Sequence, residues 1–129
     1  MATNTLDFNK LPLQQSFTLL QANDLIEAYQ LTIKAEAATT YSNLSLVGAH
    51  VKLYVKKGST TVVDGTAQTV DTASEGKFTL RIAAATTATW TGEYLYEVDM
   101  VLPVGHTNFP NGCTKTILQG RIRVKTDIG

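Results

Sequence analysis

The sequence has a single cysteine, Cys113, among its 129 residues. One thiol cannot form a disulfide within the chain, and it cannot supply a cysteine-based zinc site. Charged residues make up only 17% of the chain, and 11 basic side chains balance 11 acidic ones to a formal net charge of zero. A neutral chain lacks the electrostatic footprint of a nucleic-acid binder and gives equally little support to adsorption on anionic lipid. We therefore expect neither nucleic acid nor membrane as a partner.

Long apolar runs and sorting signals are also missing. No apolar run approaches the ~18 residues that a membrane-spanning helix needs. The N-terminal residues lack a basic region followed by an apolar stretch, so they do not resemble a secretory signal. The length fits one domain with a short extension. We expect a protein that is made in a cytoplasm and that leaves the cell, if it does, by a route without a signal peptide.

Motifs of catalysis and cofactor binding do not occur in the sequence. There is no phosphate-binding loop, no dinucleotide fingerprint and no nucleophile elbow. The two histidines, His50 and His106, cannot hold a metal by themselves; we expect His50 on the outer face of a strand and His106 in a loop. These observations predict no enzymatic activity, no cofactor, no metal and no small-molecule substrate.

Acidic residues gather on one predicted strand face but do not form a catalytic pair. At ~3.3 Å per residue, Glu93 and Glu97 lie about 13 Å apart, which is wide for a retaining glycosidase. Nothing nearby in the sequence predicts a raised pKa for either carboxyl. We expect a charged outer face opposite basic residues such as Arg121 and Arg123.

What the sequence does contain is threonine and alternation. Threonine occurs 20 times, and it favours pleated, half-buried surfaces. Apolar and polar residues alternate with a period of two, as in strands with one buried face. The clean stretches are 29–36, 49–56, 77–82, 93–100 and 114–124, with weaker strands at 16–20, 60–63 and 66–70. No segment has a helical period over ten residues, although a single helical turn fits within 83–89.

This pattern predicts an all-β protein. Short alternating strands joined by turns form antiparallel sheets, and two such sheets stack into a sandwich. We expect an immunoglobulin-like antiparallel β-sandwich of about 7–8 strands over residues 15–129. A small barrel is the alternative, because sequence does not reveal whether a sheet closes.

Residues 1–14 are interpreted as an extended N-terminal arm, because their apolar residues follow no strand pattern and Pro12 disfavours a helix. The arm could lie along its own domain or on a neighbouring subunit. Its apolar side chains are candidate assembly contacts: Leu6, Phe8, Leu11 and Leu13.

Aromatic residues divide into core and surface candidates. Tyr94 and Tyr96 share a face with apolar residues and are expected in the core, and Trp90 is expected to close one end of the sandwich. The candidate exposed contact aromatics are Tyr41, Tyr54 and Phe109.

Three segments carry a family resemblance. Residues 44–56 place a glycine before an alternating strand, residues 90–98 read Trp-Thr-Gly-Glu-Tyr-Leu-Tyr-Glu-Val, and residues 117–127 form a closing strand with an internal glycine. In this order they resemble immunoglobulin-like structural proteins of tailed bacteriophages, including the N-terminal domains of baseplate upper proteins and tail accessory proteins.

The resemblance implies a non-enzymatic structural or adaptor protein of the virion, in the tail, baseplate or fibre-attachment region. Its partners would be other virion proteins and copies of itself, and particles would assemble in the host cytoplasm and leave by lysis. One alternative is a capsid or neck accessory (decoration) protein of the same fold. Another is a carbohydrate-binding β-sandwich module, in which exposed aromatics would contact the glycan.

Overall fold

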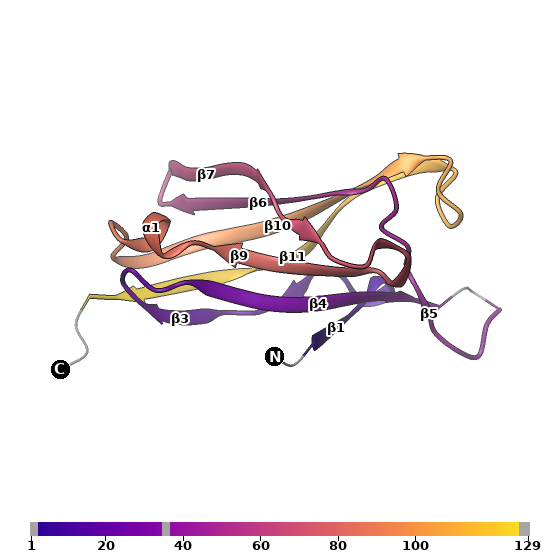
Figure 1. The fold of residues 1–129 in the computed structure, drawn as a ribbon, viewed down its shortest axis with the longest axis horizontal. Helices are drawn as coiled ribbons and strands as arrows, with labels where there is room; N and C mark the ends of the chain where they lie inside the picture. Colours follow the sequence, from indigo (N-terminus) through magenta and orange to yellow (C-terminus); the bar gives the residue numbers. More distant parts are fainter. Residues whose placement is uncertain (1–2, 35–36, 127–129) are drawn as a thin grey trace.

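A computed structural model describes residues 3–34 and 37–126, which form two β-sheets packed face to face around one apolar core (Figure 1). The first sheet has the strand order β1-β4-β9-β8, and β5 pairs with the end of β4. Its strands are β1 (Thr3–Asp7), β4 (Leu25–Ile33), β5 (Ser42–Asn43), β8 (Thr69–Val70) and β9 (Lys77–Ile82).

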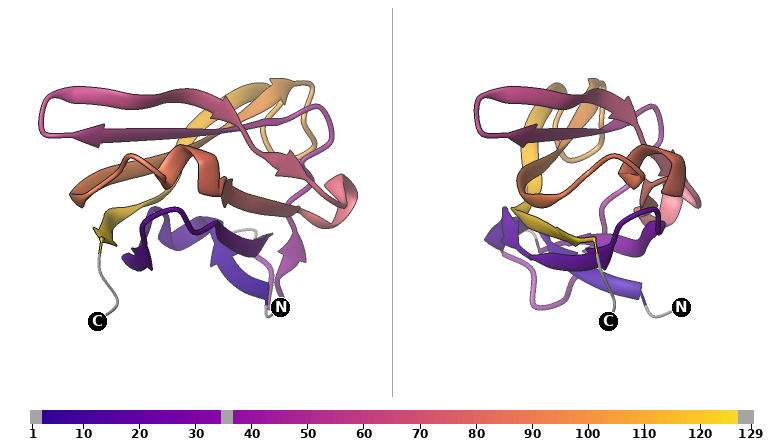
Figure 2. Two further views of the ribbon diagram at one scale, coloured as in Figure 1. Left: turned by 60° about the vertical axis from the view of Figure 1, so that its left-hand side comes forward. Right: turned by 90° about the vertical axis from the view of Figure 1, so that its left-hand side faces the viewer.

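The second sheet has the order β2-β11-β10-β6-β7, and β3 also pairs with β11. Its strands are β2 (Leu13–Gln14), β3 (Phe17–Leu20), β6 (His50–Lys57), β7 (Thr60–Ala67), β10 (Gly92–Val104) and β11 (Asn111–Lys125). The short helices are η1 (Phe8–Lys10), η2 (Ala73–Glu75) and α1 (Ala84–Thr87), the last being the single helical turn expected between β9 and β10. Figure 2 shows the β6–β7 hairpin on the opposite side of the molecule from β4 and β3.

The β-sandwich is confirmed, and so are the buried faces of its alternating strands. Apolar residues at every second position of β4, β6, β9 and β10 fill the core, as a period of two requires. Trp90, which precedes β10, is also buried and stacks on Tyr94 with 4.6 Å between ring centroids. The inward-facing side chains include Tyr29, Leu31, Val51, Leu53, Val55, Phe78, Leu80, Ile82, Tyr96, Val98 and Met100.

The sheets are mixed rather than purely antiparallel. The pairs of β1 with β4 and of β2 and β3 with β11 are parallel, and all three involve the N-terminal segment. A strand that no hairpin turn joins to its partner can pair with it in either direction. The expected extended arm over residues 1–14 accordingly lies along its own domain, with β1 in one sheet and β2 in the other; Met1 and Ala2 lie outside the described residues.

Two bulged strands interrupt simple alternation. In β11 the register shifts between Val98 and Asp99 of β10, so Ile117 has no partner there and is buried next to Leu118. In β7 the register against β6 shifts at Gly65, whose φ of 73° suits a bulge. The weak strand expected at 60–63 therefore continues through this bulge to Ala67, because glycine supplies the conformation without ending the pairing.

Candidate functional site

The outer face of the second sheet carries an exposed leucine between two cations. Leu95 points outward from β10, and 57% of it is exposed. The strand register places Lys56 of β6 on one side of it and Arg121 of β11 on the other. Arg121 also forms an exposed ion pair with Glu93, with 3.7 Å between nitrogen and oxygen. The expected charged face with cross-strand pairing is confirmed, but it has an apolar centre.

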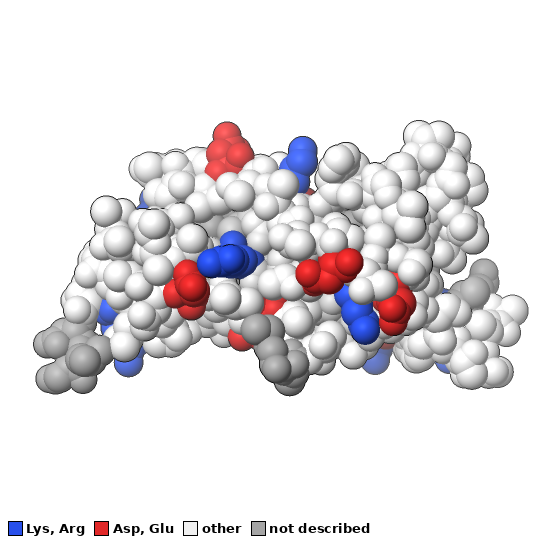
Figure 3. All heavy atoms as spheres, viewed as in Figure 1, with Lys and Arg blue, Asp and Glu red and all other residues white. Residues whose placement is uncertain are grey.

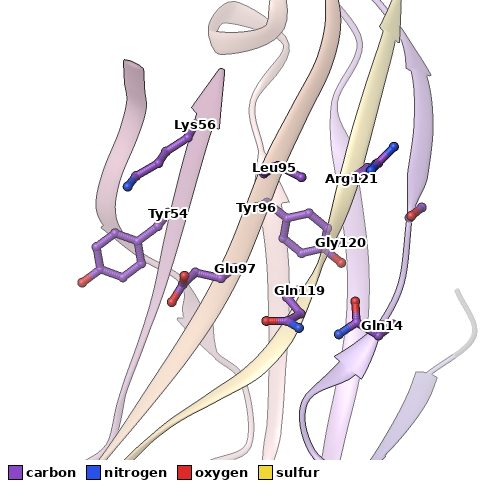
Figure 4. Close-up of a pocket in the computed structure, with 10 residues that line it drawn as sticks. Gln14, Tyr54, Lys56, Leu95, Tyr96, Glu97, Gln119, Gly120 and Arg121 are labelled. Carbon is purple, nitrogen blue, oxygen red and sulfur yellow. The ribbon is translucent and has the colours of Figure 1, made fainter. Parts of the chain in front are cut away.

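The next row of the same face is polar. Glu97 of β10 lies between Tyr54 of β6 and Gln119 of β11. Together the two rows line a groove of about 450 Å³. Gln14 and Ser16, from the N-terminal part of the chain, also border it. Figure 4 shows these side chains: Tyr54 and Lys56 on β6, Leu95 and Glu97 on β10, and Gln119 and Arg121 on β11.

A pair of neighbouring carboxyls adjoins the groove. The pKa of Glu97 is raised above its ordinary value, first because its side chain shares a hydrogen bond with Asp99, and then by partial burial and the charge of Asp99. The Thr116 hydroxyl donates to Asp99 Oδ1 at 2.8 Å, and Thr116 and Lys56 act on Glu97 in the opposite direction. The expectation that nothing raises a carboxyl pKa here is wrong, because Glu97 and Asp99 are adjacent on the same strand face.

Acidic and basic side chains elsewhere are interspersed. Figure 3 shows them as small groups of opposite sign on an otherwise uncharged face. The ion pairs include Lys77 with Glu75 at 3.5 Å and Arg81 with Asp24 at 3.8 Å. These exposed pairs contribute little to stability, but they leave the face without a strong field of one sign.

The three candidate contact aromatics have different surroundings. Tyr54 borders the groove, while Phe109 lies in the β10–β11 loop and packs half-buried against Phe8, with 4.9 Å between ring centroids. Tyr41 is exposed, and its hydroxyl donates to Asp7 Oδ2 at 3.0 Å. That hydrogen bond raises the pKa of Tyr41. The structure thus brings Phe109 together with an assembly candidate rather than with Tyr54.

The four candidate assembly residues differ in exposure. Leu6 is 1% exposed and belongs to the apolar core, so in this conformation its side chain does not reach the surface. Phe8 and Leu11 pack half-buried against that core, and Leu13 is 38% exposed on β2. A role of these residues in assembly stays a prediction.

The histidines and the cysteine are apart from one another. His50 is exposed, as expected. His106 is buried although it lies in a loop, because its Nε2 bonds to the Ser45 carbonyl oxygen at 2.7 Å and its Nδ1 accepts from the Asn108 amide at 3.0 Å. Among the described residues, no three His, Cys, Asp or Glu side chains lie together as a metal site. Over the same residues, no helix is long and apolar enough to cross a membrane.

Sequence reasoning missed Gln15, which joins the two sheets. Its carbonyl oxygen accepts from the Tyr96 hydroxyl and its side-chain Oε1 accepts from the Tyr29 hydroxyl, both at 2.6 Å. Burial raises the pKa of both tyrosines. A β-carbon on Gly120 would overlap the Gln15 carbonyl oxygen, so glycine is required there. The isolated glycine inside a strand pattern was the available signal, since it often marks a close backbone approach.

Comparison with known proteins gives a likeness of fold. No family model matches the sequence, and no curated protein matches it. Among solved structures, the chain is similar to the N-terminal domain of phage TP901-1 ORF48, with a TM-score of 0.54 and 10% sequence identity. The similarity covers 95% of this chain and 96% of that chain. Nearly the whole chain therefore has the fold of a phage protein domain.

Proposed function

We propose that the chain is a non-enzymatic structural or adaptor protein of a tailed-bacteriophage virion, which acts in the tail, baseplate or fibre-attachment region. The observation that carries this proposal is the fold likeness to a phage protein domain, which runs through nearly the full length of both chains. The order of the three strand segments at residues 44–56, 90–98 and 117–127 points to the same class of protein.

The chemistry of the surface supports contact as the mode of action. The groove has an apolar centre at Leu95, and Lys56 and Arg121 border it. An apolar anchor within a polar rim is the usual anatomy of a protein interface. The proposed partners are other virion proteins and copies of this chain; nucleic acid, membrane and small-molecule substrates have no part in the proposal.

The test is to ask whether the protein is a component of the particle. Tailed particles from the organism that carries the gene would be purified by density gradient, and their proteins quantified by mass spectrometry. We expect the chain at a constant ratio to the major tail protein across the particle peak. A chain that stays entirely in the soluble lysate while particles are complete would contradict the proposal.

Position within the particle separates the tail assignment from its alternative, a capsid or neck decoration protein. Gold-labelled antibody against the chain should bind at the tail tip or along the tail. Label on the capsid or neck would replace the tail proposal by the alternative while keeping the virion role.

A carbohydrate-binding module is the second candidate, because Tyr54 borders a groove that also offers amide and charged groups. An aromatic face beside hydrogen-bonding side chains can stack on a sugar ring. Binding of the purified chain to a glycan array that Tyr54→Ala abolishes, and that Tyr41→Ala leaves intact, would favour this candidate. No binding by the parent chain would exclude it.

A further inference from the structure

The N-terminal segment, residues 3–20, holds three strands that all lie at outer positions of the sheets. Within the described residues, β1 pairs only with β4, while β2 and β3 pair only with β11. All these pairs are parallel, so no hairpin connects a strand of the segment to its partner. The segment continues into the rest of the domain through one connection, residues 21–24, between β3 and β4.

This connection is a tight turn in which one residue has an unfavourable backbone conformation. The Asn23 amide donates to the Leu20 carbonyl oxygen at 3.2 Å, which closes a four-residue turn. Ala22, the third residue of that turn, has a φ of 66° and is the non-glycine residue with positive φ in the described structure. The left-handed region is unfavourable for a residue that has a β-carbon, and this turn position normally takes glycine or asparagine. Extending residues 21–24 would release this conformation.

The body of the sandwich is incomplete without the segment. Leu6 fills part of the shared core. The hydroxyls of Tyr29 and Tyr96 are buried in the core region, and the oxygen that each donates to belongs to Gln15. Buried hydroxyls that lose their acceptors are costly. Any segment that packs where residues 3–20 do must therefore supply a leucine and two acceptor oxygens at the spacing that residues 6 and 15 have.

We propose that residues 3–20 exchange between two copies of the chain, with residues 21–24 as the hinge. In the exchanged dimer, β1 pairs with β4 of the other copy, and β2 and β3 pair with its β11. Every contact that the segment makes within one chain is remade between chains, so the dimer needs no new surface chemistry. The turn at Ala22 opens in both copies, which breaks the hydrogen bonds of Asn23 with Thr87 and of Asp24 with the Ala84 amide. The strain of a short hinge is the contribution that favours exchange.

The first experiment shortens the hinge. Deletion of residues 22 and 23 should prevent the closed turn, and size-exclusion chromatography with light scattering should then give a dimer. The exchange is located by Thr18→Cys with Arg123→Cys, two exposed positions that face one another across β3 and β11, in a Cys113→Ala background. Oxidation should link the two chains of the dimer. A folded monomer, or a dimer whose disulfide lies within one chain, overturns the proposal.

The second experiment keeps the hinge length and needs no deletion. The chain with the two cysteines is refolded at high concentration, where we expect interchain-linked dimer. Ala22→Gly relieves the closed turn, so it should lower the yield of dimer by about fivefold. Ala88→Gly, at an exposed position with ordinary helical angles, is the matched control and should leave the yield unchanged. Absence of linked dimer from the parent chain, or equal yields for both variants, overturns the proposal.

Discussion

Tyr96 offers a quantitative test of how the N-terminal segment is held. The side chain is 4% exposed, and its hydroxyl donates to the Gln15 carbonyl oxygen at 2.6 Å. Tyr96→Phe removes this hydrogen bond and leaves the carbonyl without its donor, which should cost about 1–3 kcal/mol of unfolding free energy. Tyr96→Ala also removes the buried ring, for a total of about 4 kcal/mol or more. Because small domains are stable by only ~5–15 kcal/mol, the alanine variant should be close to unfolding.

Urea denaturation of the purified variants measures both steps. Tyr54→Phe is the matched control, because Tyr54 lies on the outer face of the sheet and should change the unfolding free energy by less than about 0.5 kcal/mol. If Tyr96→Phe and Tyr54→Phe are equally stable, the hydroxyl does not reach Gln15, and the described path of the N-terminal segment is wrong.

Alkaline pH gives an independent reading of the same network. Burial raises the pKa of Tyr29 and Tyr96 above the ordinary value of 10.0, so the folded state keeps these protons longer than the unfolded state. The stability that these two protonated hydroxyls give the folded state is therefore fully present below pH 10 and is lost as the pH rises above it. Each tyrosine should lower the unfolding free energy by about 1.4 kcal/mol per pH unit in that range. Tyr96→Phe should make this slope shallower by about 1.4 kcal/mol per pH unit, and an unchanged slope would contradict the burial of its hydroxyl.

The remaining predictions concern the groove and its neighbourhood. Gly120→Ala should lower the unfolding free energy by about 1–3 kcal/mol or more, because the new methyl overlaps a backbone oxygen; parent-like stability in urea would refute this. Leu95→Asp should keep the parent melting temperature but reduce incorporation into particles, whereas Val104→Asp, at an 81% exposed position outside the groove, should not. Glu97→Gln should slightly raise the melting temperature at neutral pH and have less effect at about pH 3, which lies below the ordinary pKa of aspartate and glutamate side chains. An equal change in melting temperature at both pH values would show that repulsion between the Glu97 and Asp99 carboxyls is not involved.

The strands and their faces could be predicted from the sequence because each depends on local alternation. Phe78, Leu80 and Ile82 lie at every second position of a short stretch, and burying one face of it places all three in the core. The fold class follows from several such stretches joined by turns. The apolar centre of the groove was missed, because Leu95 occupies an outward position where the pattern predicts only polar side chains.

The rest depends on contacts between distant parts of the chain. Leu6 is buried because β1 pairs in parallel with β4, and no local pattern encodes a parallel partner about 25 residues away. The burial of Ile117 requires a register shift, which depends on how β10 and β11 meet. Gln15 is important through its position between two tyrosines from different sheets. The positions of glutamine residues in the sequence do not reveal which one lies between two sheets and accepts hydrogen bonds from both.

A cryo-electron microscopy map of the purified tailed particle tests the central proposal most directly. We predict density for this β-sandwich in the tail, baseplate or fibre-attachment region, with the outer face around Leu95 covered by a neighbouring subunit. A particle map in which every tail and capsid density is explained by other chains, with this protein absent, would contradict the account.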